Sequence, residues 1–323
     1  MDGKDLRIVF MGTPEFAVES LKALFKNGYQ VVGVVTAPDR PSGRGQKLHQ
    51  SDVKVYAESC GLPVLQPEKL KDESFLQELK SLKADLQIIV AFRMLPEVVW
   101  KMPQFGTFNL HGSLLPRYRG AAPLNWSIIN GDTETGVTTF LLKQEIDTGN
   151  ILFQEKIQIC PEMTVGDLHD ALMVIGAEMV LQTVDAIAEG NYQPLPQDSL
   201  TIDPVRLHAP KIFKETCKID WQKPCGVIHN LVRGLSPYPA AWTNFTRSGI
   251  ETSVKIFKTS VELIEHNDLP GIIVTDNKKF LKIACSDGYL HLIDIQLSGK
   301  KRMGIAEFLR GFQNAGEYST AEM

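Results

Sequence analysis

The chain has 323 residues, of which 43% are hydrophobic and 22% charged, and its formal net charge is -4. This composition is typical of a folded globular protein and excludes a disordered chain, a coiled coil or a collagen-like repeat. The length suits one large domain or two ordinary ones, because single hydrophobic cores tend to split beyond about 250–300 residues.

The first half of the chain alternates short apolar runs with helical patterns. The runs predict strands at 6–11, 31–35, 63–65, 84–92 and 106–110, with a pair at 137–141 and 151–154 that flanks a loop. The helical patterns cover 15–27, 53–60, 74–82, 122–130 and, as the longest, 165–189. Strands that are apolar throughout and separated by helices indicate a mostly parallel sheet covered on both faces, as in a Rossmann-like α/β fold.

The pattern changes after Gly190. The segment 191–210 holds four prolines and no sustained periodicity, which predicts a linker. One helical stretch follows at 225–233, and then short β-like runs at 254–257, 271–275, 280–284 and 289–296. Short, closely spaced strands predict a small β-barrel or sandwich.

The chain carries no sign of membrane insertion or secretion. No stretch approaches the roughly 20 uncharged apolar residues of a membrane helix, and the polar start does not look like a signal or transit peptide. The five cysteines are scattered and form no C-x-x-C pair. Zinc and disulfide interpretations therefore lack support, and we expect a reducing, cytoplasmic location.

The loop after the first predicted strand argues against a dinucleotide. Residues 11–16 read M-G-T-P-E-F, with one glycine and a proline where G-x-G-x-x-G would leave bare backbone for a pyrophosphate. No Walker-type G-x-x-x-x-G-K-[ST] occurs either. A nicotinamide, flavin or P-loop nucleotide site is disfavoured.

The loop after the second predicted strand is cationic. Residues 37–48 carry Arg40, Arg44 and Lys47 beside two glycines, a composition that suits a phosphate backbone. From His208 onward the chain has 15 basic and 12 acidic residues, which leaves 19 and 26 of the totals of 34 and 38 before it. The mildly basic second part hints at a polyanion contact. A solvated surface turn and an ordinary charge fluctuation explain these features equally well.

Residues 108–123 hold the strongest chemical signal. Asn109 and His111 lie two apart at the end of a predicted strand, so they point to one face. An amide donor beside an imidazole suits the negative charge that develops in acyl transfer, and histidine exchanges a proton near neutral pH. Asp147, in a later loop, is a carboxylate that could orient the ring or receive a proton. By spacing alone, structural roles for all three remain the commoner explanation.

Family resemblance adds what spacing cannot decide. The run N-L-H-G-S-L-L-P at 109–116, followed by D-T-G at 147–149, resembles the folate-dependent formyltransferase superfamily. The segments 10–17, 39–45 and 117–123 resemble the branch of that superfamily that acts on methionyl-tRNA, and the likeness extends to residues 235–242. It covers the whole chain through several separate motifs.

The resemblance implies a site, a fold and partners. Asn109, His111 and Asp147 match the catalytic set. The residues that match the wall of the folate site are Ser113, Leu114, Leu115 and Pro116. Arg40, Arg44 and Lys47 fall in the loop that engages tRNA. The implied domains are a catalytic domain at 1–190, a linker at 191–210 and a small OB-like β-barrel at 211–323 that contacts tRNA.

The implied reaction transfers a formyl group from 10-formyltetrahydrofolate to the α-amine of methionyl-initiator tRNA, without a metal, by a cytoplasmic monomer. The rivals are a formyltransferase acting on a small amine, such as a ribonucleotide or amino sugar, and a non-catalytic RNA-binding protein. One departure affects the folate pocket. A-F-R-M-L-P at 91–96 stands where the family has an Ala-Tyr-Gly run one residue longer, and it includes Arg93.

Overall fold

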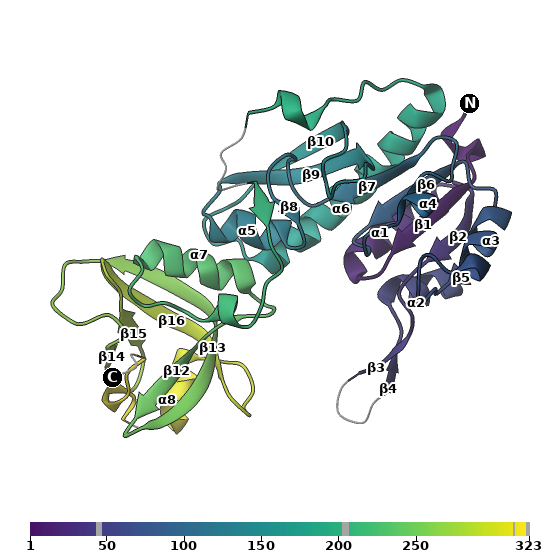
Figure 1. The fold of residues 1–323 in the computed structure, drawn as a ribbon. Coiled ribbons are helices and arrows are strands. Elements are labelled where there is room, and N and C mark those ends of the chain that lie inside the picture. The colour runs from purple at the N-terminus through teal and green to yellow at the C-terminus, as the bar shows by residue number, and fades with distance from the viewer. Residues whose placement is uncertain (43–46, 202–206, 313, 321–323) are drawn as a thin grey trace. The chain divides into compact units, whose positions relative to one another are not determined.

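The computed structural model describes residues 1–42, 47–201, 207–312 and 314–320 (Figure 1). The chain forms two compact units. The first contains residues 1–120, 135–157 and 169–209, and the second contains residues 121–134 and 158–168 together with the chain from 210 onward.

The first unit is built on a seven-stranded sheet in the order β10-β9-β7-β6-β1-β2-β5. Its strands are β1 (Ile8–Gly12), β2 (Val31–Val35), β5 (Val64–Leu65), β6 (Leu86–Val90), β7 (Thr107–His111), β9 (Glu134–Leu141) and β10 (Ile151–Gln158). The run from β7 to β5 is parallel, and β9 is antiparallel to β7. This confirms the mostly parallel, Rossmann-like sheet that the apolar strand runs predicted.

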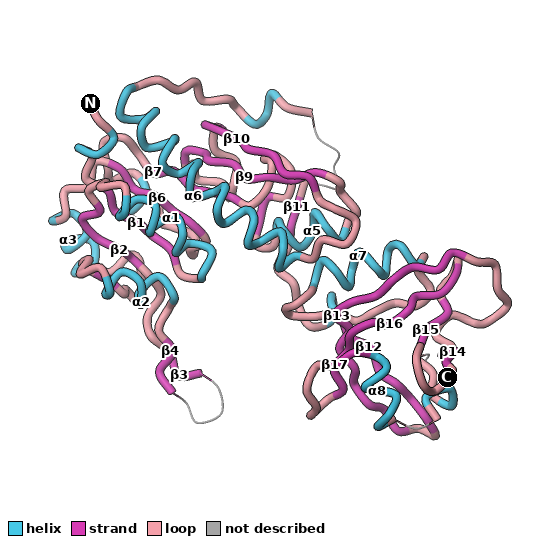
Figure 2. The backbone as a smooth tube through the Cα atoms, turned by 180° about the vertical axis from the view of Figure 1, so that it is seen from behind, coloured by secondary structure: helices cyan, strands magenta, loops and turns pink. Residues whose placement is uncertain are grey.

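Helices cover both faces of this sheet (Figure 2). They are α1 (Glu15–Lys26), α2 (Asp52–Ser59), α3 (Glu73–Ser81), α4 (Glu97–Trp100) and α6 (Val165–Glu189). On one face, Phe75 of α3 and Val99 of α4 share a core with Val9 of β1. On the other, α1 contacts β1 and β6, and α6 lies close enough to β7 that a Cβ on Gly176 would stand 2.7 Å from a methyl of Leu110.

Helix α6 corrects one expectation from the sequence. It is long and apolar enough to cross a membrane by length and composition, with a mean hydropathy of 1.6 over its most apolar window. Half of that window is buried inside the fold, where Val180 and Val184 are fully covered. The apolar side chains of α6 therefore serve its packing against the sheet. A helix of this apolar character was not expected from the sequence.

The second unit holds a curled antiparallel sheet in the order β12-β13-β16-β15-β14, with β17 beside β16. The strands are β12 (Ala241–Arg247), β13 (Ile250–Leu263), β14 (Ile273–Thr275), β15 (Leu281–Ala284), β16 (Gly288–Leu297) and β17 (Met303–Gly304). Ser319 bridges Thr246 of β12 and Ile272 beside β14, so it lies between the two edges of the sheet. The expected small β-barrel domain is thus present as a half-barrel.

Among the described residues, the α-helices that lie wholly in the second unit are α5 (Pro123–Ile129), α7 (Cys225–Leu235) and α8 (Ile305–Gly311). Ile228 of α7 and Phe308 of α8 fill the core of the half-barrel together with Phe245 of β12. Helix α5 packs on α7, where the Asn125 Nδ2 donates to the Gly234 carbonyl at 2.8 Å. A segment from the first half of the sequence therefore lies in the second unit.

The proline-containing segment after α6 lies along the first unit. Leu195 forms a bridge to Ile151, and residues Gln197–Ser199 make one 3-10 turn. Further on, the short strand β11 (His208–Ala209) pairs in parallel with β8 (Arg119–Gly120). These contacts bring the segment beside the loops at the end of β7.

The cationic loop is a hairpin. Its strands are β3 (Arg40–Ser42) and β4 (Lys47–His49), and Figure 1 shows them projecting from the sheet end near α2. At its root the Lys54 Nζ donates to Asp39 Oδ2 at 2.6 Å, and the Gln66 Nε2 donates to Asp39 Oδ1 at 2.7 Å. These two bonds lower the pKa of the Asp39 carboxyl, with the Lys54 bond first, and the Asp39 bond raises the pKa of Lys54.

Candidate active site

The carboxyl end of β7 brings Asn109 and His111 together. They pair across to Phe140 and Thr138 of β9, and the alternation of the strand directs both side chains to one face, as predicted. Asn109 is half-buried, and among the described residues its Oδ1 has no hydrogen-bond partner although it is shielded from solvent. A buried amide oxygen without a partner is costly, and such a group is a candidate for contact with a bound molecule.

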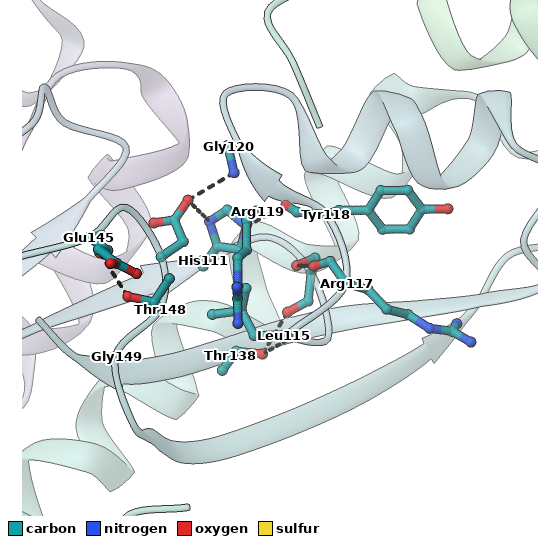
Figure 3. A network of polar contacts seen from close by, with 12 residues as sticks. His111, Leu115, Arg117, Tyr118, Arg119, Gly120, Thr138, Glu145, Thr148 and Gly149 are labelled. Atoms are coloured by element: carbon teal, nitrogen blue, oxygen red, sulfur yellow. Dashed lines mark hydrogen bonds and ion pairs between the residues drawn. The ribbon is translucent and has the colours of Figure 1, made fainter. Parts of the chain in front are cut away.

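His111 is 6% exposed, and both of its ring nitrogens face polar groups (Figure 3). Nε2 lies 2.9 Å from the Tyr118 carbonyl oxygen, and Nδ1 lies 3.9 Å from Asp147 Oδ2. A carbonyl can only accept, so Nε2 carries a proton. Nδ1 is therefore the ring nitrogen left on the side of Asp147.

Asp147 lies in the loop that joins β9 to β10. Its Oδ2 accepts a hydrogen bond from the Gly120 amide at 2.9 Å, and its backbone has a φ of +53°. Thr148 donates its hydroxyl to the Glu145 carbonyl within the same loop. A Cβ at Gly149 would stand 1.6 Å from the Leu141 carbonyl oxygen, so only glycine fits there. These contacts account for the D-T-G sequence and bring Asp147 to the histidine.

Sequence reasoning missed two partners of this carboxylate loop. One is the Gly120 amide. The other is Gln197, whose Nε2 donates to the carbonyls of Asp147 and Gly149. Gln197 lies in the segment expected to be a linker, where no periodicity marked it. Only the Pro-containing composition was visible, and composition carries no information on tertiary contacts.

The Ser113-to-Pro116 turn follows β7 directly, and most of it is buried. The Ser113 hydroxyl donates to the Arg117 carbonyl at 2.6 Å. The Leu115 amide donates to Thr138 Oγ1 at 3.0 Å, and Gln154 Nε2 donates to the Leu115 carbonyl at 2.8 Å. Leu114 is the half-buried member of the turn. These bonds hold the turn at Ser113 and Leu115, next to His111 in the chain.

Arg93, which stands out in the sequence, is a tether between two loops. Its Nη1 donates to the Glu68 carbonyl at 3.0 Å, and its Nη2 donates to the Pro67 carbonyl. Burial lowers the pKa of this guanidinium. The shortened loop after β6 is therefore fixed to the loop after β5 by the arginine.

Two of the three cationic residues proposed for tRNA, Arg40 and Lys47, lie in the hairpin. Arg40 begins β3 and is exposed. Lys47 begins β4, and Arg44 lies outside the described residues. The hairpin and the site around His111 both belong to the first unit, but they are formed by different segments of the chain.

Within the part of the chain that the structure describes, no three His, Cys, Asp or Glu side chains are grouped to hold a metal ion. The chemistry available at the end of β7 is that of an amide, an imidazole and a carboxylate. Together they can donate to a developing negative charge and move a proton, which suits acyl transfer to an amine.

The fold agrees with the comparisons with known proteins. The family model of formyl transferase matches residues 6–184, and that of the formyl transferase C-terminal domain matches residues 211–313. The chain belongs to the formyl transferase family. It is 58% identical to a methionyl-tRNA formyltransferase of Parabacteroides distasonis and 54% identical to one of Bacteroides thetaiotaomicron, over 99% and 98% of this chain and 99% of each relative.

The solved structures that resemble this chain are more distant. One is the N-formyltransferase of Helicobacter canadensis with folinic acid and dTDP-3-aminofucose, at a TM-score of 0.65 and 22% identity, covering 92% of this chain and 100% of that one. Another is HypX of Aquifex aeolicus with tetrahydrofolic acid, at a TM-score of 0.61 and 19% identity, covering 94% and 47%. At these identities the likeness shows a shared fold.

Proposed function

We propose that this protein transfers the formyl group of 10-formyltetrahydrofolate to the α-amino group of methionyl-initiator tRNA. The observation that carries the proposal is the grouping of Asn109, His111 and Asp147 at the end of β7, in a chain more than half identical to methionyl-tRNA formyltransferases over nearly its whole length. The new bond joins the amine nitrogen to the formyl carbon. The bond from that carbon to N10 breaks, one proton leaves the amine and one reaches N10.

Each of these three residues has a proposed task. Asn109 is proposed to donate through its Nδ2 to the formyl oxygen as negative charge develops there, whereas its unpartnered Oδ1 can only accept. The Nε2 of His111 is bonded to the Tyr118 carbonyl, so the ring is proposed to act through Nδ1, which donates to the formyl oxygen when it carries a proton taken from solvent. Asp147 stands beside Nδ1, where it stabilises the protonated ring, receives the proton of the attacking amine and passes it to the departing N10.

Folate and tRNA have separate proposed contacts. The Ser113-to-Pro116 turn, next to His111, is the proposed wall of the folate site. Arg40, Arg44 and Lys47 are proposed to contact tRNA phosphates, as is the mildly basic half-barrel unit. The division into a catalytic domain at 1–190, a linker at 191–210 and a tRNA-contacting domain at 211–323 belongs to the same proposal, as do a monomeric state and a cytoplasmic location.

A formyl-transfer assay tests this function. Purified protein and 10-formyltetrahydrofolate are incubated with methionyl-initiator tRNA, with free methionine and with a nucleotide-linked amino sugar, and the formylated products are measured. We expect rapid transfer to methionyl-initiator tRNA alone. Preferred transfer to a small amine would establish the rival formyltransferase, and transfer to none of them would leave the protein without this activity.

A further inference from the structure

A fully bonded glutamine lies beneath the loop that carries Asp147. Gln197 is 2% exposed. Its Nε2 donates to the carbonyl oxygens of Asp147 at 2.8 Å and Gly149 at 2.7 Å. Its Oε1 accepts from the Nε of Arg119 at 3.0 Å and from the Nη2 at 2.7 Å. Both amide hydrogens and both lone pairs of the oxygen are therefore in use.

The orientation of this amide follows from its partners. Carbonyl oxygens only accept and a guanidinium only donates, so the Gln197 nitrogen must face the loop and its oxygen must face Arg119. A carboxylate at this position would set an oxygen against two carbonyls, and an apolar side chain would leave them without a donor. Glutamine is thus matched to this place by hydrogen bonding as well as by size.

Asp147 needs such support because of its backbone. A φ of +53° lies in the left-handed region that residues with side chains rarely adopt, and such conformations persist only where the surroundings impose them. Strand β8 imposes this one at two points. The Gly120 amide holds the Asp147 carboxylate, and Arg119, the preceding residue, holds its carbonyl through Gln197.

We propose that Gln197 is a positioning residue for formyl transfer, which keeps the Asp147 carboxylate beside the His111 ring without touching the reacting atoms. The inference rests on the proposed function in that it takes Asp147 to act in the proton transfer. Under this proposal, the segment that contains Gln197, between the two family-model matches, takes part in the catalytic centre.

Two substitutions separate hydrogen bonding from space filling. Gln197→Glu keeps the shape and the contact with Arg119 but loses the donors to the loop, and Gln197→Met keeps only the bulk. We expect each to lower kcat by about 10- to 100-fold, the range for a displaced catalytic group, with KM for tRNA and folate little changed. Ser199→Ala is the matched control, because this hydroxyl bonds Pro196 within the same turn. It should keep wild-type kcat.

Hydrogen exchange gives a readout that does not depend on activity. Amides of residues 143–150 should exchange faster in both Gln197 variants than in wild type or Ser199→Ala. Unchanged exchange, or faster exchange with a wild-type kcat, overturns the inference. If a Gln197 variant does not fold, Arg119→Lys replaces it, because a lysine cannot give the two-pronged donation to Oε1; the same lowered kcat and faster exchange are expected.

Failure of the proposed function would look different. Wild-type protein would then form no formyl-methionyl-tRNA, whereas exchange in residues 143–150 would still report whether Gln197 holds the loop. A double substitution of Arg119 and Gln197 adds a further check. It should cost about as much kcat as the Gln197 change alone, since the two residues act through one chain of bonds. Additive losses would contradict that chain.

Discussion

The site at the end of β7 and the hairpin of β3 and β4 are held in opposite ways. His111 is bonded at Nε2 and faces Asp147 at Nδ1, and Asp147 is held at its carboxylate and its carbonyl. The hairpin strands are exposed at Arg40 and Leu48 and are fixed at the root by Asp39. Chemistry on a small group needs fixed geometry, whereas contact with a phosphate backbone tolerates a less confined arm.

The largest expected effect lies at the rigid site. Asn109→Ala and Asp147→Ala should fold normally. We expect kcat to fall about 10²- to 10³-fold for Asn109→Ala, which removes a donor to a developing charge, and about 10²- to 10⁴-fold for Asp147→Ala, which removes a proton acceptor. Steady-state kinetics with a thermal melt would measure this. If either variant retained a near-native rate, its assigned role would be wrong.

The next effect concerns the cationic residues of the hairpin. Arg44→Ala should weaken tRNA binding and lower the slope of log affinity against log salt by about one, since one phosphate contact is lost. Folate affinity should not change. Lys26→Ala, an exposed cation at the end of α1, is the control and should leave the slope as it is. An unchanged salt slope for Arg44→Ala would mean that the residue does not contact a phosphate and that the segment is an ordinary surface turn.

A smaller effect is expected at the hairpin root. Asp39→Ala removes the acceptor shared by Lys54 and Gln66, so the arm loses its anchor while its cations remain. Binding of tRNA should weaken by less than for Arg44→Ala, and the salt slope should stay near that of wild type. If the salt slope of Asp39→Ala were as low as that of Arg44→Ala, Asp39 would affect binding through charge and not by positioning the hairpin.

The smallest effect lies in the second unit, at His229. Its Nδ1 lies 2.9 Å from Thr259 Oγ1, and burial lowers its pKa, with Arg233 acting in the same direction and Glu162 opposing. The unfolded chain therefore binds the proton first as pH falls. The contribution of His229 to stability is complete above about pH 6.5 and is lost as pH falls toward the folded pKa. Melting temperatures between about pH 7.5 and 5.5 should fall less for His229→Gln than for wild type; equal slopes would contradict this.

Apolar pattern predicted most of the fold. Helix α6 and strand β2 have the predicted bounds, because a long periodic stretch and a wholly buried run leave little choice. Strand β12 was missed, since its burial alternates along Ala241–Arg247 and the sequence shows no apolar run there. The hairpin was expected only as a flexible loop, because its strands bury little and are defined by their mutual pairing.

The candidate site likewise contains residues that the sequence predicted and residues that it did not. The Asn109 and His111 pair follows from strand alternation, so spacing alone placed the two side chains on one face. Asp147 joined them only through family resemblance, because no local pattern shows that a loop 36 residues beyond His111 returns to it. Gln197 had no signal at all, since its role exists only in the bonds that it makes to Arg119 and to the Asp147 loop.

A single-turnover experiment tests most directly the division between a rigid catalytic site and a binding arm. Enzyme saturated with 10-formyltetrahydrofolate and methionyl-initiator tRNA would be compared for wild type, Asn109→Ala and Arg44→Ala. We predict that Asn109→Ala slows the formyl-transfer step about 10²- to 10³-fold and that Arg44→Ala leaves it at the wild-type rate. Equal slowing of the step in both variants, or normal transfer by Asn109→Ala, would contradict the account.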